Sequence, residues 1–309
     1  MKIIYFGTPE FAVKPLENLY GDSEFEIIAV VTQPDKPQGR KQILTASPVK
    51  DCAEKLGIPV IQPKNKQELA EELKKIEKVD FFVVIAYGMI LTKEVLEMPK
   101  YGPINVHASL LPKYRGASPI QEALLHGDTN TGVSIMAMDE TMDHGNIYLI
   151  KRLNIDENDS LESLTNKLSE MSAEILPLAL KDIKSGILTP LPQNHQKATF
   201  CHKIEKEDGK IDFSKSAVET KNMLRAFTPW PGIFTEFNGK KIKIIEATVS
   251  NDKIEPGKFK IDGKILKIGT SDGALIPSKL QIEGKNVMDA AAFINGYKSQ
   301  ISGFLDLVT

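Results

Sequence analysis

The chain has 309 residues, of which 41% are hydrophobic and 26% charged, and its formal net charge at pH 7 is −2. This balance is that of an ordinary soluble globular protein with a sizeable core, and the length suggests two domains. The two cysteines, Cys52 and Cys201, belong to no CxxC or Cys/His cluster, which argues against a disulfide framework and a structural zinc site.

Strand-like and helix-like segments alternate over the first two-thirds of the chain. Short apolar runs predict strands at 2–6, 24–33, 79–88, 102–109, 132–139 and 147–155. Apolar residues at helical spacing predict helices at 47–57 and from Leu161 to about Ile175. Alternating βα units of this kind predict an α/β fold with a Rossmann-like, mostly parallel sheet that helices cover on both faces.

The turn after the first strand reads FGTPEF. Thr8 is predicted to cap the next helix, with Pro9 at the first helical position and Glu10 stabilised by the helix dipole. Gly7 has no second glycine nearby, so the GxGxxG fingerprint of a dinucleotide site is missing. The sequence therefore argues against a nicotinamide or flavin cofactor.

The segment that follows the second strand reads QPDKPQGRKQILTASPVK, from Gln33 to Lys50. Pro34, Pro37 and Gly39 are expected to prevent regular structure in it. We therefore expect an exposed loop that leaves the second strand.

The composition of the sequence changes near Pro190. Residues 190–205 are polar and irregular, as in a linker. Further on, Asn238-Gly239 and Asp262-Gly263 each separate two strand-like runs and predict tight hairpins, because these residues tolerate positive φ. We therefore predict an N-terminal domain at 1–189, a linker at 190–205 and a small OB-like β-barrel at 206–309.

The C-terminal part is mildly basic. From Lys206 to the end there are 16 Lys and Arg residues against 13 Asp and Glu residues, a net charge of +3. Such a charge suits a polyanionic partner but does not identify one.

The sequence also predicts the cellular compartment of the protein. The most apolar segment, 79–91, is too short to span a bilayer, which needs about 20 apolar residues. The opening MKIIYFGTPEF lacks the long apolar run and cleavage site of a signal peptide. These features predict a cytoplasmic protein without a membrane partner.

Polar side chains interrupt the predicted strand within INVHASLLPKYRGASPI, from Ile104 to Ile120. Asn105 and His107 are two residues apart, so on a strand they face the same side. An amide and an imidazole can together stabilise a developing oxyanion, and the imidazole can move a proton. A buried structural histidine beside a turn-forming asparagine would explain the same dipeptide.

A carboxylate near His107 would favour the catalytic interpretation. The loop MAMDETMDHGNI offers Asp139, Glu140 and Asp143, any of which could orient the imidazole and stabilise its protonated form. An ordinary solvated acidic loop is the alternative. No serine or cysteine stands on a sharp elbow, so direct acyl transfer fits better than a covalent intermediate.

Taken together, the Asn105-x-His107 pair, the turn Ser109–Pro112 and the distant Asp143-x-Gly145 resemble the signature of the folate-dependent formyltransferases. The similarity extends over nearly the whole chain and narrows toward the members of that family that formylate methionyl-initiator tRNA. It includes FGTPEFA, VTQPDKPQGR, SPVK, VVIAYGMIL, INVHASLLPKYRGASPIQ, KEDGKIDF and RAFTPWPG.

The resemblance implies a reaction and a catalytic trio. It implies transfer of the formyl group of 10-formyltetrahydrofolate to the α-amine of methionyl-initiator tRNA. No metal is expected, because the formyl group is already activated and side chains supply the stabilising charges, and no protein partner is expected. Asn105, His107 and Asp143 would be the catalytic residues.

The resemblance also implies two binding regions. Folate would contact the turn Ser109, Leu110, Leu111 and Pro112, the backbone of Ile85, Ala86 and Tyr87, and the loop that begins at Asp139. The tRNA would contact Lys36, Arg40 and Lys41.

Two positions depart from the family pattern. Relatives often read Asp-Thr-Gly-Asp where this chain reads Asp143-His144-Gly145-Asn146. Lys41-Gln42 stands where many relatives carry glycine and more lysine.

Two other functions fit parts of the sequence. One is formylation of an amino sugar nucleotide, and the other is a nucleic-acid-binding or regulatory protein whose α/β domain has lost catalysis. The intact trio argues against the second, and the basic loop at Lys36 and Arg40, with the extra C-terminal domain, favours RNA over a sugar nucleotide.

Overall fold

The computed structural model describes residues 1–38, 42–237 and 239–301, which form two compact units. The first unit comprises Met1–Pro119, Asn130–Ile155 and Ser163–Cys201. The second comprises Ile120–Thr129, Asp156–Glu162 and the chain from His202 onward. Each unit is thus built from several chain segments, and the boundaries 1–189, 190–205 and 206–309 stay a prediction.

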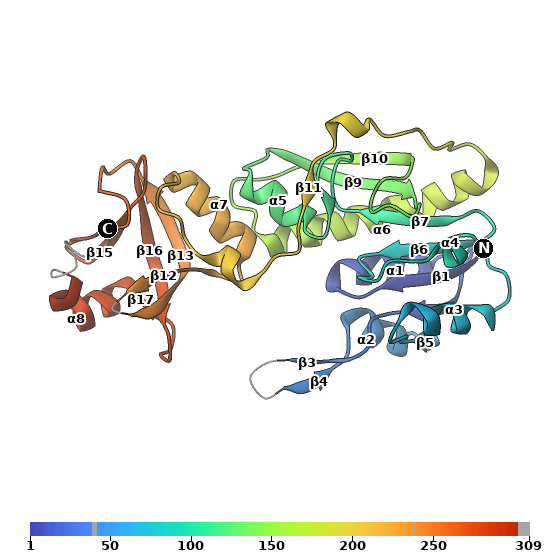
Figure 1. The fold of residues 1–309 in the computed structure, drawn as a ribbon, viewed down its shortest axis with the longest axis horizontal. Coiled ribbons are helices and arrows are strands. Elements are labelled where there is room, and N and C mark those ends of the chain that lie inside the picture. The colour runs from blue at the N-terminus through green and yellow to red at the C-terminus, as the bar shows by residue number, and fades with distance from the viewer. Residues whose placement is uncertain (39–41, 238, 302–309) are drawn as a thin grey trace. The chain divides into compact units, whose positions relative to one another are not determined.

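A seven-stranded sheet organises the first unit, in the order β10-β9-β7-β6-β1-β2-β5. The five strands from β7 to β5 are parallel, and β9 and β10 are antiparallel to their neighbours. Their bounds are β1 Lys2–Gly7, β2 Glu26–Val31, β5 Val60–Ile61, β6 Phe81–Ile85, β7 Pro103–His107, β9 Asn130–Ala137 and β10 Ile147–Asn154 (Figure 1). The prediction of a Rossmann-like, mostly parallel sheet is confirmed.

Helices connect these strands, and two helix predictions had different outcomes. Ser47 caps α2 by accepting a hydrogen bond from Lys50 N over 3.1 Å, so the helix predicted at 47–57 is confirmed. Thr8 does not cap a helix, because its Oγ1 donates to the carbonyl of Tyr87 instead. The helices are α1 Val13–Gly21, α2 Pro48–Lys55, α3 Lys66–Lys74, α4 Lys93–Leu96 and α6 Leu161–Ser185, with a short 3-10 turn at Glu10–Ala12 before α1.

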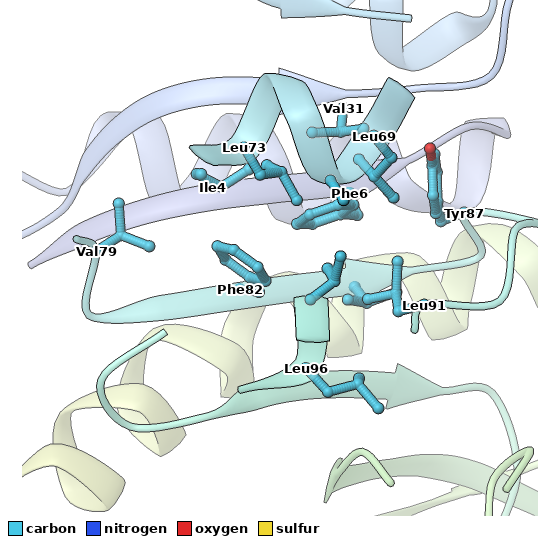
Figure 2. Close-up of a cluster of buried hydrophobic side chains, with 13 residues drawn as sticks. Ile4, Phe6, Val31, Leu69, Leu73, Val79, Phe82, Tyr87, Leu91 and Leu96 are labelled. Carbon is cyan, nitrogen blue, oxygen red and sulfur yellow. The ribbon is translucent and has the colours of Figure 1, made fainter. Parts of the chain in front are cut away.

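A buried apolar cluster packs helices against one face of this sheet (Figure 2). Phe6 of β1 lies with its ring centre 5.1 Å from that of Phe82 in β6 and 5.4 Å from that of Tyr87. Leu69 and Leu73 of α3 cover these rings. Tyr87 lies two residues after the end of β6, so the cluster holds the chain just beyond that strand.

The segment Gln33–Lys50 is more ordered than the sequence predicts. Its described residues form a two-stranded antiparallel hairpin, β3 Lys36–Gln38 and β4 Ile43–Thr45, which projects from the rest of the first unit (Figure 1). Pro37 pairs with Leu44 in this hairpin. Proline is compatible with a strand when its missing N–H faces away from the partner, as at a sheet edge, so the prediction of a structureless loop was wrong here.

An antiparallel sheet organises the second unit, in the order β12-β13-β16-β15-β14, with β17 paired to β16. Phe237 pairs with Lys240, and Asp262 pairs with Ile265, so both predicted hairpins form. Its elements are α5 Pro119–Leu125, a 3-10 turn at Lys206–Gly209, α7 Ala217–Phe227, β12 Ile233–Phe237, β13 Lys240–Ser250, β14 Phe259–Asp262, β15 Ile265–Gly269, β16 Ala274–Ile282, β17 Met288–Asp289 and α8 Ala290–Ile301. The antiparallel sheet of this unit agrees with the predicted fold class.

Within the described parts of the chain, no helix is both long enough and apolar enough to cross a membrane.

Candidate active site

Three side chains that the sequence singles out meet beside β7. Asn105 Nδ2 donates to Asp143 Oδ1 over 3.2 Å, and His107 Nδ1 lies 3.6 Å from the same oxygen. Asn105 and His107 therefore face one side of β7, as their spacing predicts, and one carboxylate reaches both. The trio stands at the carboxyl end of β7, where parallel α/β sheets bind ligands.

Both ring nitrogens of His107 face oxygen atoms. Its Nε2 lies 2.9 Å from the carbonyl oxygen of Tyr114, and its Nδ1 faces Asp143. The Nε2 contact is within hydrogen-bond distance, whereas the Nδ1 contact is longer than a hydrogen bond. The side chain is 6% exposed, so both contacts lie in a site with little water around it.

Asp143 is held at both its side chain and its backbone. Its Oδ2 accepts a hydrogen bond from Gly116 N over 2.8 Å, and its carbonyl accepts one from Gln193 Nε2 over 2.9 Å. Its φ is +52°, a left-handed conformation that few residues other than glycine adopt. The loop thus presents this carboxylate to the histidine in a backbone geometry that neighbouring residues must maintain.

The turn Ser109–Pro112 is anchored to β9 by one hydroxyl. Ser134 Oγ donates to Ser109 O over 2.7 Å and accepts from Leu111 N over 3.1 Å. Ser109 is fully buried, whereas Leu110 and Pro112 are half-buried. The apolar sides of Leu110 and Pro112 are therefore the parts of this turn that a ligand could contact.

The backbone after β6 forms a second candidate binding edge. Ile85 and Tyr87 are buried, and burial raises the pKa of Tyr87 well above its usual value. Ala86 between them is exposed and has a φ of +48°. Met138 packs against the cluster that contains Tyr87, which brings the loop from Asp139 onward to the same region.

The residues predicted to contact tRNA are only partly described. Lys36 is exposed at the start of β3. Arg40 and Lys41 lie outside the described residues.

Two residues near Asp143 carry no signal in the sequence analysis. Gln193, which is 6% exposed, bonds to the carbonyls of Asp143 and Gly145 although it belongs to the predicted linker. Arg115, which is 4% exposed, bonds to Gln193 across 78 positions of sequence. A polar irregular segment gives no periodicity from which such a burial could be inferred.

In the part of the chain that the structure describes, no three His, Cys, Asp or Glu side chains are grouped so that they could hold a metal ion. The expectation that no metal is required stays a prediction.

Comparison with known proteins places the chain in a class. Residues 1–180 match the formyl transferase family and residues 203–298 match the formyl transferase C-terminal domain. The chain belongs to the formyl transferase family.

Its similar relatives narrow this class. It is 46% identical to a methionyl-tRNA formyltransferase of Caldicellulosiruptor saccharolyticus, covering 96% of this chain and 97% of the relative. It is 45% identical to the methionyl-tRNA formyltransferase of Myxococcus xanthus, covering 96% and 95%. A solved sugar 3N-formyl transferase shares the fold, with a TM-score of 0.67 at 23% identity over 93% of this chain and 99% of that one.

Proposed function

We propose that this protein transfers the formyl group of 10-formyltetrahydrofolate to the α-amine of methionyl-initiator tRNA, giving N-formylmethionyl-tRNA for translation initiation. The observation that carries the proposal is the meeting of Asn105, His107 and Asp143 at the end of β7. The full-length similarity to methionyl-tRNA formyltransferases supports this amine acceptor over an amino sugar.

Each member of the trio has a role that its contacts suit. The α-amine, which is partly neutral because free α-amino groups titrate near about 8, attacks the formyl carbon. Asn105 and the protonated His107 donate to the oxygen on which negative charge develops. Asp143 orients His107, balances its charge and helps to remove the proton of the attacking nitrogen.

The described residues fit a folate on chemical grounds. Bound 10-formyltetrahydrofolate would supply a formyl group that is already attached to a nitrogen leaving group. The exposed, left-handed backbone at Ala86 offers peptide groups to a pterin edge, and the half-buried Leu110 and Pro112 offer apolar contact.

The tRNA would use two surfaces. The sequence between Gln33 and Lys50 contains the basic residues Lys36, Arg40 and Lys41, of which Arg40 would hold the acceptor end by pairing with phosphate or stacking on an unpaired base. The basic residues from Lys206 onward would contact the phosphate backbone, so affinity should fall with added salt. The protein would act in the cytoplasm without a metal or a protein partner.

His107→Ala tests the proposal directly. Loss of one oxyanion donor typically lowers turnover by about 10²–10³-fold, so we expect formylation of methionyl-initiator tRNA to fall by at least that much while folate binding persists. His126→Ala is the matched control, because His126 lies directly after α5 and its side chain is 60% exposed.

The same assay should offer an amino sugar nucleotide beside the charged tRNA. Formylation of the sugar alone would replace the proposed acceptor, and no formylation of either would support the regulatory alternative. Turnover of His107→Ala within a few-fold of the parent would remove His107 from the mechanism.

A further inference from the structure

We propose that Arg115 and Gln193 are positioning residues that hold Asp143 in the backbone conformation from which its carboxylate reaches His107. This inference rests on the proposed function, because it assumes that Asp143 supports the histidine during formyl transfer.

The amide of Gln193 is bound on both sides. Its Nε2 donates to the carbonyl of Asp143 over 2.9 Å and to the carbonyl of Gly145 over 2.7 Å. The first carbonyl belongs to the left-handed residue Asp143, and the second belongs to the residue two positions further along. A single NH₂ group therefore clamps the turn that sets the direction of the Asp143 side chain.

Arg115 fixes which way that amide points. Its Nε and one terminal nitrogen donate to Gln193 Oε1 over 3.2 and 2.6 Å. A guanidinium has no acceptor, so it can bind only the oxygen of the amide and leaves the NH₂ group directed at the loop. A lysine ammonium could not supply this fork in the same geometry.

A short strand joins Arg115 to the other contact of Asp143. Strand β8, Arg115–Gly116, pairs with β11, Phe200–Cys201. Gly116 N donates to Asp143 Oδ2 over 2.8 Å. Gly116 thus binds the Asp143 carboxylate directly, and its neighbour Arg115 reaches the Asp143 backbone through Gln193. The pairing of β8 with β11 holds these two residues in place.

Two histidines complete the support of Arg115. His195 Nδ1 lies 2.9 Å from an Arg115 nitrogen and therefore accepts its hydrogen bond, which requires an unprotonated Nδ1. Its ring stacks on that of His144 with centres 4.1 Å apart, and Asp139 Oδ2 binds His144 Nδ1 over 2.8 Å. Loss of water contact, with His144 and Arg115 nearby, lowers the pKa of His195, which suits the acceptor role.

Gln193→Glu separates positioning from general stability. The new carboxylate keeps an acceptor for Arg115 but places an oxygen where the NH₂ group met the carbonyls of Asp143 and Gly145. We expect kcat to fall about 10²-fold, the typical cost of a misplacement of about 1 Å, while KM for both substrates stays within about two-fold. Gln196→Ala, an exposed glutamine in the same segment, should behave as the parent.

Arg115→Lys is the second variant, and it decides the question if Gln193→Glu does not fold. It keeps the charge but loses the fork, and we expect about a ten-fold lower kcat with KM for both substrates within about two-fold of the parent. Parent-like kcat in a folded variant, or a rise in KM that accounts for the whole loss, would overturn the proposal. All variants are assayed with the amine that the parent enzyme formylates. If the parent does not formylate methionyl-tRNA, the proposed function is wrong; if only the variants lose kcat, the positioning role is supported.

Discussion

Gly145→Ala should damage catalysis through a clash of about the size of one methyl group. Gly145 stands two residues after Asp143, and a Cβ built on it would lie 2.0 Å from the carbonyl oxygen of Ala137 in β9. Ala137 cannot move away easily, because its N–H donates a hydrogen bond to Asn146 O over 2.8 Å. This bond ties the strand and the loop together at this point.

The size of the displacement follows from this distance. Carbon and oxygen atoms approach to roughly 3.3 Å in the closest ordinary contacts, so the loop must move about 1.3 Å away from β9. A shift of about 1 Å in a catalytic group can cost about 10²-fold in rate, which corresponds to about 2.7 kcal/mol of activation free energy. We therefore expect kcat of Gly145→Ala to fall by about 10²-fold.

Steady-state formylation kinetics with both substrates varied would measure this loss, and thermal unfolding would verify that the variant folds. Gly21→Ala is the matched control, because a Cβ at Gly21 would meet no atom within 4 Å and its backbone conformation is ordinary for a residue with a side chain. A folded Gly145→Ala protein with the kcat of the parent would refute the reasoning, since the loop could then move without affecting Asp143.

Other predictions concern substrate contact, the core and pH. Arg40→Leu should lower kcat/KM toward charged tRNA by about ten-fold, or about 1.4 kcal/mol, with folate binding unchanged; a parallel loss of folate binding would place the hairpin in the wrong site. Leu69 is 1% exposed, so Leu69→Ala should lower the free energy of unfolding by about 2–5 kcal/mol in urea titrations. Leu178 is 60% exposed, so Leu178→Ala should leave it unchanged, and equal losses for both variants would contradict the burial argument. Hydrogen bonds from Lys50, the larger cause, and from Gln62 lower the pKa of Asp35 below its ordinary value of 3.8. The ionised Asp35 therefore stabilises the folded protein above its unfolded pKa, and this stabilisation is lost as the pH falls through the lower folded pKa. The difference in melting temperature between the parent and Lys50→Ala should therefore shrink below about pH 4, and a difference that persists at pH 2 would exclude this cause.

The sheet of the first unit could be predicted because its signal is local. Runs such as Phe81–Ile85 are apolar throughout, as strands buried on both faces must be, and helical spacing marks the segments between them. The prediction for Thr8 failed because its hydroxyl has two possible partners, a helix end and a carbonyl 79 residues away, and the fold supplies the second. No local pattern distinguishes these outcomes.

The residues of the candidate site also differ in whether a local sequence pattern reveals them. Asn105 and His107 could be paired from the sequence because residues two apart on a strand share a face. The carboxylate-rich loop left Asp139, Glu140 and Asp143 as alternatives, and only the family resemblance pointed to Asp143. Arg115 and Gln193 could not be found, since their contact depends on where a chain segment 78 positions away returns to the sheet. Their residue types are common on protein surfaces, and only burial reveals them.

The segmented make-up of the second unit has a consequence for how the protein can be made and altered. The chain alternates between the units five times, through 120–129 and 156–162 before it enters the second unit for good at His202. These two short stretches leave the ribosome well before the residues they pack with, such as Asn222 of α7, whose side chain closely faces Gly127. Synthesis must therefore reach α7 before either stretch can be covered. An exchange of C-terminal domains between relatives would need to carry both stretches along, because a single cut near residue 203 would leave them facing a foreign partner.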